Sequence, residues 1–211
     1  MGGRWSDLRD ISKTRDRDVR TAFALEYFTL AWMVVEAVVA VVSGVLAHSI
    51  ALVAFGLDSV IEFFAALAVI WQLRGLEQER ESRERIALRL IAVTFFALSA
   101  YVTVEAVIDL ARRSRPEASA AGIVLAAAAL VVMPLLFVAK ARIARRIDNA
   151  ALAADAHESL FCGILAAVLL LGLTLNAAFG WWWADPVAAL VVAVFAVREG
   201  IEALQESSGD D

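Results

Sequence analysis

The sequence predicts an all-α membrane protein built as a bundle of six transmembrane helices. Of the 211 residues, 61% are hydrophobic, whereas soluble domains are usually about 45–50% apolar. The excess is concentrated in six long runs, and a run of roughly 20 apolar residues is enough to cross a bilayer as a helix. The runs lack the alternation of strands, and a helix satisfies its own backbone hydrogen bonds in lipid.

The six expected spans fill residues 22–204 and leave no room for a separate soluble domain. They are Ala22–Leu46, Ile50–Leu73, Ile86–Ala111, Ala118–Ala139, Ala150–Ala178 and Trp183–Leu204. The charged link Arg74–Arg85 is expected to extend a helix into water, and the tryptophans Trp181–Trp183 suit the headgroup region. Residues 1–21 are expected to form a polar arm without signal-peptide features. Residues 205–211 are expected to form a disordered acidic tail.

Basic residues predict the orientation of the bundle. With the N-terminus inside, sixteen Lys and Arg fall on the inner side and three, Arg112, Arg113 and Arg115, on the outer side. The positive-inside rule then places both termini in the cytoplasm. We expect a bacterial inner membrane. No basic face remains for nucleic acid, and the single cysteine, Cys162, excludes an internal disulfide.

The second run contains two carboxylates where the membrane should be dry. Asp58 and Glu62 are four residues apart and therefore lie on one face of a helix. An ionised carboxylate at this depth costs about 2.5–3.5 kcal/mol on insertion scales. Two such groups repel each other unless a proton or a cation lies between them. The alternative is a polar seam between helices, which Ser, Thr or Gly would form at lower cost.

The fifth run carries a matching set of polar residues. Asp155, Glu158 and Cys162 share a helix face, and His157 lies about 100° around the helix from Glu158. If this helix faces the second, Asp58, Glu62, Glu158 and Cys162 can form a four-ligand cage for a divalent metal. Three oxygens and one thiolate suit Zn²⁺, with Mn²⁺, Fe²⁺ or Co²⁺ as alternatives. Alone, Cys162 would be read as a small buried hydrophobe.

Several further polar residues keep more than one interpretation. Asp155 and His157 are additional candidate ligands, and His157 could instead carry a proton or support a ligand. His48 lies in a short outer turn, where a histidine is usually solvated. Glu36 and Glu105 could line an entry path or pair with arginines at helix ends, and the role of Glu26 stays open.

An ordered set of segments resembles the cation diffusion facilitator family. The segments are HSIALVAFGLDSVIE, NAALAADAHESLFCG and WWWADPVAALVVAVFAVREGIEAL. They cover most of residues 47–204. The resemblance implies a six-helix transporter that exchanges a divalent metal for protons by alternating access. It also implies a homodimer in the bilayer, no catalysis and no resident cofactor. Carried over by position, the metal ligands are Asp58, Glu62, Glu158 and Cys162.

The chain departs from the family pattern in three places. The typical fifth-helix pair is His and Asp, whereas Glu158 and Cys162 stand here. Glu62 occupies a position that is often Asp. We also expect a short member without the cytoplasmic domain that commonly follows the sixth helix. A non-transporting scaffold or metal sensor, and a passive cation channel, remain alternatives at this stage.

Overall fold

The computed structural model describes residues 3–74 and 80–208, and within these ranges it contains helices and no strand. The six expected helices are confirmed. They are α1 (Gly3–Ala47), α2 (Ile50–Arg74), α3 (Arg80–Arg112), α4 (Ala120–Ile147), α5 (Ala150–Phe179) and α6 (Ala184–Ser208). The expected helical extension over 74–85 is helical from Arg80 onward, and residues 75–79 lie outside the described residues.

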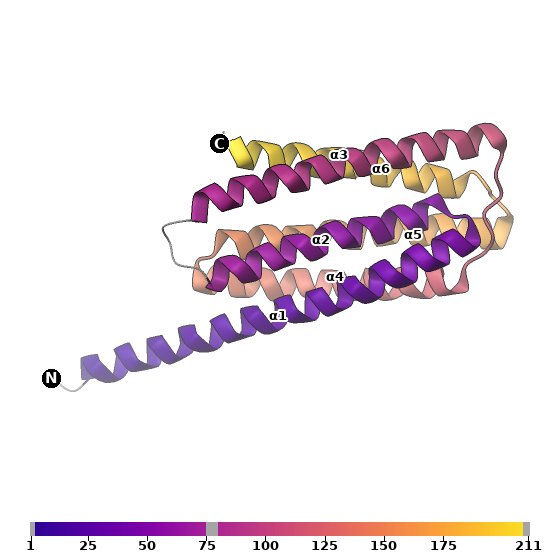
Figure 1. Ribbon diagram of the computed structural model, residues 1–211. Coiled ribbons are helices and arrows are strands. Elements are labelled where there is room, and N and C mark those ends of the chain that lie inside the picture. The colour runs from indigo at the N-terminus through magenta and orange to yellow at the C-terminus, as the bar shows by residue number, and fades with distance from the viewer. Residues whose placement is uncertain (1–2, 75–79, 209–211) are drawn as a thin grey trace.

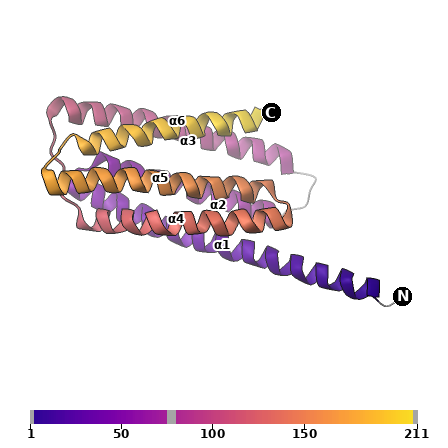
Figure 2. The ribbon, with the colours of Figure 1, turned by 180° about the vertical axis from the view of Figure 1, so that it is seen from behind.

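The helices form a four-helix group with a pair beside it. α1, α2, α4 and α5 run alongside one another, while α3 packs mainly against α6 (Figures 1 and 2). α6 also contacts α2 and α5. The two helices that carry the predicted ligands therefore contact each other and share α6 as a neighbour.

The surface of the bundle is apolar. Large hydrophobic side chains face outward on every helix, for example Val38 on α1, Val104 on α3 and Leu135 on α4, each more than half exposed. Lipid is the environment in which such a surface is stable. Within the described residues, five helices are long and apolar enough to cross a membrane. α6 is not among them, because charged residues at both ends confine its uncharged stretch to Pro186–Val197.

Helix extends beyond the expected spans at both ends of the chain. The polar arm, residues 1–21, is helical from Gly3 and continues without a break into the first span, so α1 projects beyond the other helices (Figure 1). The tail is not disordered from residue 205, because α6 continues to Ser208. Residues 209–211 lie outside the described residues.

Two glycines allow α1 and α2 to approach closely. A Cβ on Gly44 would lie 2.8 Å from the backbone nitrogen of Val53, and a Cβ on Gly56 would lie 2.9 Å from that of Val41. Small residues commonly permit such contacts between membrane helices. The close packing brings the polar residues of α1 next to those of α2.

Hydrogen bonds connect the N-terminal end of α6 to the N-terminal end of α2. The carboxylate of Asp185 accepts hydrogen bonds from the hydroxyl of Ser49 and from the backbone N–H of Ala51. The Ser49 hydroxyl also accepts a bond from the N–H of Leu52 and so caps α2. The contact between Ser49 and Asp185 thus joins two helices at one end of the bundle.

Candidate metal centre

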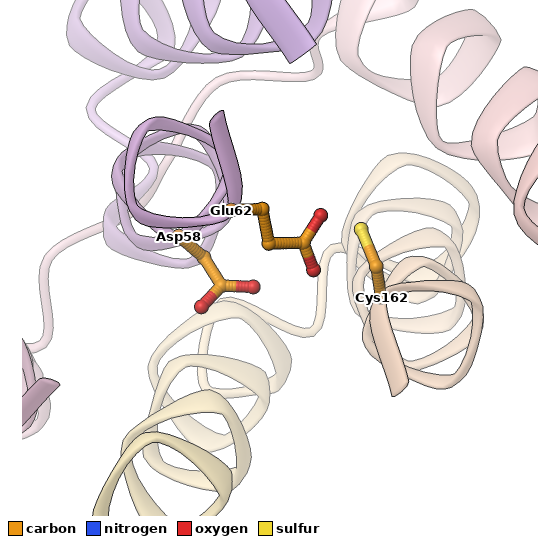
Figure 3. Close-up of side chains that lie close together, drawn as sticks. All are labelled: Asp58, Glu62 and Cys162. Carbon is orange, nitrogen blue, oxygen red and sulfur yellow. The ribbon is translucent and has the colours of Figure 1, made fainter. Parts of the chain in front are cut away.

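Three of the four predicted ligands lie together between α2 and α5. Each of Asp58, Glu62 and Cys162 offers a ligand atom within 4.8 Å of the other two. The side chain of Glu62 extends from α2 toward the sulfur of Cys162 on α5, with the Asp58 carboxylate beside it (Figure 3). A modest contraction would bring all three atoms to the roughly 2.0–2.3 Å metal–ligand distances of a zinc site.

The fourth predicted ligand, Glu158, faces the same space. It lines a cavity of about 20 Å³ together with Asp58, Glu62 and Cys162. Its Oε2 atom is buried without a hydrogen-bond partner. About 10–15 Å³ of such volume is enough for one water molecule. The cavity therefore has room for one small ion close to four ligating side chains.

A carboxylate from α6 also reaches this cavity. Glu199 lines it with the residues of α2 and α5. Nothing in the sequence pattern singles out Glu199, because it lies beside Arg198 near the end of the expected span. Its position inside the bundle follows from the packing of α6 against both ligand-bearing helices.

Glu36 on α1 is buried directly behind the cysteine. Its Oε1 accepts hydrogen bonds from the thiol of Cys162 at 3.4 Å and from the hydroxyl of Ser59 at 2.8 Å. The indole N–H of Trp32 donates to Oε2 at 2.5 Å. Glu36 therefore belongs to the surroundings of the metal centre and not to a helix-end ion pair.

Asp155 does not join the cluster, because its carboxylate forms an ion pair with Lys140. The ammonium of Lys140 on α4 forms a buried ion pair with Asp155 on α5, and it lies 3.4 Å from the Glu26 carboxylate on α1. Lys140 is fully buried, although it lies immediately after the expected fourth span, Ala118–Ala139. A buried basic residue therefore lies beside Glu26 and Asp155. When Lys140 is left out of the count of basic residues, the inner side still has far more Lys and Arg than the outer side, so the expected orientation does not change.

The two histidines lie away from the cluster. His157 is exposed, and its ring centre is 5.6 Å from that of Phe137. His48 is exposed in the α1–α2 turn and lines an open cavity of about 520 Å³ with Glu105 and Asp109. Arg112 and Arg115 line the same cavity, so Glu105 lies near arginines at a helix end as well as beside an opening, and both sequence interpretations stay open.

Residues 27–210 match the family model of the cation efflux transmembrane domain. The chain belongs to the cation efflux family. Members of this family are transporters and not enzymes, so this integral membrane protein transports metal cations. The match includes α2 and α5, which hold the four predicted ligands, and α6 with Asp185.

Proposed function

We propose that this cation efflux protein exports a divalent transition metal from the cytoplasm in exchange for protons. Zn²⁺ is the favoured substrate, with Mn²⁺, Fe²⁺ and Co²⁺ as alternatives. The observation that supports this most directly is the cluster of Asp58, Glu62 and Cys162 beside a cavity for one ion. Two carboxylates and a thiol, with Glu158 as a fourth group, match the ligands of zinc sites.

The charge of the cluster favours a cation as its occupant. Asp58, Glu62, Glu158 and Glu199 line one small cavity, and none of the described residues that line it is basic. Carboxylates this close cannot all be ionised in an apolar interior without a positive partner. A divalent metal and protons are alternative ways to supply that charge, which is the basis for exchange.

The exchange follows from the chemistry of the ligands. Each carboxyl and the thiol must release its proton before the metal binds, so metal binding and proton release are linked. On the cytoplasmic side the metal displaces these protons. Once the helices have rearranged to open the site outward, protons compete for the same groups and release the metal. A homodimer with cytoplasmic termini in a bacterial inner membrane is part of the proposal.

The test is zinc flux into proteoliposomes that contain the full chain and an imposed proton gradient. Wild-type protein is expected to carry Zn²⁺ in a gradient-dependent way, and Asp58→Ala and Glu62→Ala are expected to abolish this flux. Glu202→Ala is the matched control, because Glu202 is an exposed acid on α6 that pairs with Arg198.

The rival functions predict different results. A passive channel would give Zn²⁺ flux that does not depend on the proton gradient. A scaffold would give no flux and no stabilisation by metal, with Asp58→Asn as stable as wild type. A sensor would be stabilised by metal without flux. Flux that survives in both alanine variants would reject the proposed cluster.

A further inference from the structure

We propose that Glu36 is a positioning residue that holds the thiol of Cys162 in the metal centre and so tunes the site toward thiophilic ions. This inference deepens the proposed function and rests on it. Glu36 comes from α1, which supplies none of the predicted ligands. It therefore adds α1 to a centre whose cavity is lined by residues of α2, α5 and α6.

The hydrogen bonds of Glu36 connect both ligand-bearing helices. One oxygen, Oε1, accepts from Cys162 on α5 and from Ser59 on α2, the residue that follows the predicted ligand Asp58. The other oxygen, Oε2, is held by Trp32, one turn earlier on α1. With both oxygens engaged and the side chain fully buried, the carboxylate has a fixed orientation.

That orientation constrains the sulfur. A cysteine side chain has three staggered χ1 positions, and the bond to Glu36 favours the one that also places Sγ within 4.8 Å of the Asp58 and Glu62 oxygens. The thiol donates this bond only while it is protonated, so Glu36 positions Sγ in the metal-free site, before the metal displaces the proton. Without Glu36, Sγ would be free to leave that position. The thiol would then take part in the cluster for only a fraction of the time.

Glu36 supports the cluster from outside it. Among the described residues, the compact group of ligand atoms contains Asp58, Glu62 and Cys162, and Glu36 is not part of it. Residues that hold a metal ligand in this way typically change metal affinity by about 10–100-fold when they are mutated. Here the ligand held is the soft one, which binds Zn²⁺ or Cd²⁺ better than Mn²⁺. Losing Glu36 should therefore weaken binding of thiophilic ions selectively.

The experiment compares Cd²⁺ and Mn²⁺ binding to the purified full chain in nanodiscs. Glu36→Leu is expected to weaken Cd²⁺ binding about tenfold and Mn²⁺ binding by less than about twofold. The ultraviolet thiolate-to-Cd²⁺ charge-transfer band should shrink in parallel. In a Cys162→Ala background, Glu36→Leu should have no further effect on Cd²⁺ affinity, because two residues that act through one contact are not additive.

Other results would overturn the inference. Equal losses for both ions, or an undiminished loss of Cd²⁺ affinity in the Cys162→Ala background, would mean that Glu36 supports the fold or binds metal itself. If Glu36→Leu does not fold, Trp32→Phe removes the bond to Oε2. It should lower the Cd²⁺/Mn²⁺ affinity ratio in the same direction, and an unchanged ratio would reject the proposal. Failure of the proposed function is distinguishable, because it would appear as absent or gradient-independent Zn²⁺ flux in the wild type, whereas this experiment measures binding.

Discussion

The ammonium of Lys140 on α4 is paired with the carboxylate of Asp155 on α5 inside the bundle, and Glu26 on α1 lies 3.4 Å from the same ammonium. Two acids thus share one base at the junction of three helices. Lys140 supplies the positive charge for both acids, and neither acid can take over that role. Asp155 can lose its charge and leave Lys140 with Glu26, whereas loss of Lys140 leaves two buried carboxylates facing each other.

This asymmetry predicts unequal effects on stability. Lys140→Met should lower the free energy of unfolding by about 3–5 kcal/mol, the usual result of removing one partner of a buried pair. Asp155→Asn should cost clearly less. The free energies are to be measured by detergent titration in mixed micelles. The triple variant Glu26→Gln/Lys140→Met/Asp155→Asn removes every charge and should recover much of the loss. Equal costs for the two single variants would show that Glu26 does not contribute to the pairing.

Because of the same ion pair, Asp155 and Glu158, which are three residues apart on α5, are expected to have different roles. Glu158 faces the metal cavity, while Asp155 is engaged by Lys140. Glu158→Gln should therefore weaken Zn²⁺ binding by at least about tenfold, measured by calorimetry on the full chain in nanodiscs. Asp155→Asn should leave Zn²⁺ affinity within about twofold of wild type, since it removes no group that faces the cavity. If Asp155→Asn weakened binding as much as Glu158→Gln does, Asp155 would have to be counted as a ligand.

The sequence predicted the candidate ligands on α2 and α5 because they follow the helical repeat. Asp58 and Glu62 stand out as acids in an apolar run, and Glu158 and Cys162 have the same spacing. Periodicity assigns residues to one face of a helix but does not say which face meets which neighbour. The placement of Asp155 opposite Lys140, and of Glu158 toward the cavity, depends on the packing of α5 between α4 and α2.

The spacing of the polar residues of α1 indicates which face of this helix is buried. The helix is apolar on nearly every side, so its hydrophobic residues do not mark the face that is buried. Its polar residues do. Glu26, Thr29 and Glu36 fall on one stripe with Met33, and all four are almost fully buried. In a membrane helix, polar side chains at spacings of three, four and seven residues indicate the face toward the protein. Reading α1 in this way would have placed Glu36 in the interior.

The contact between Asp185 and Ser49 predicts a stability effect at the other end of the bundle. Asp185→Ala leaves a buried hydroxyl and the N–H of Ala51 without their acceptor. The free energy of unfolding should fall by about 1–3 kcal/mol, measured by detergent titration in mixed micelles. Glu202→Ala on the same helix removes only an exposed ion pair and should change it by less than about 0.5 kcal/mol. Equal effects of the two substitutions would show that the Asp185 contact does not hold α6 to α2.

The ligand set predicts the direction in which pH changes metal affinity. The carboxyls of Asp58 and Glu62 and the thiol of Cys162 must be unprotonated to bind a metal, so acidification should weaken Zn²⁺ binding and alkalinisation should strengthen it. By linkage, affinity changes about tenfold per pH unit for each proton released. Calorimetry in buffers of different ionisation enthalpy counts these protons directly. Cys162→Ala should reduce the number released and flatten the pH dependence, because it removes one exchangeable proton without altering the carboxylates. An affinity that does not depend on pH would contradict proton exchange at this site, even if the metal is bound.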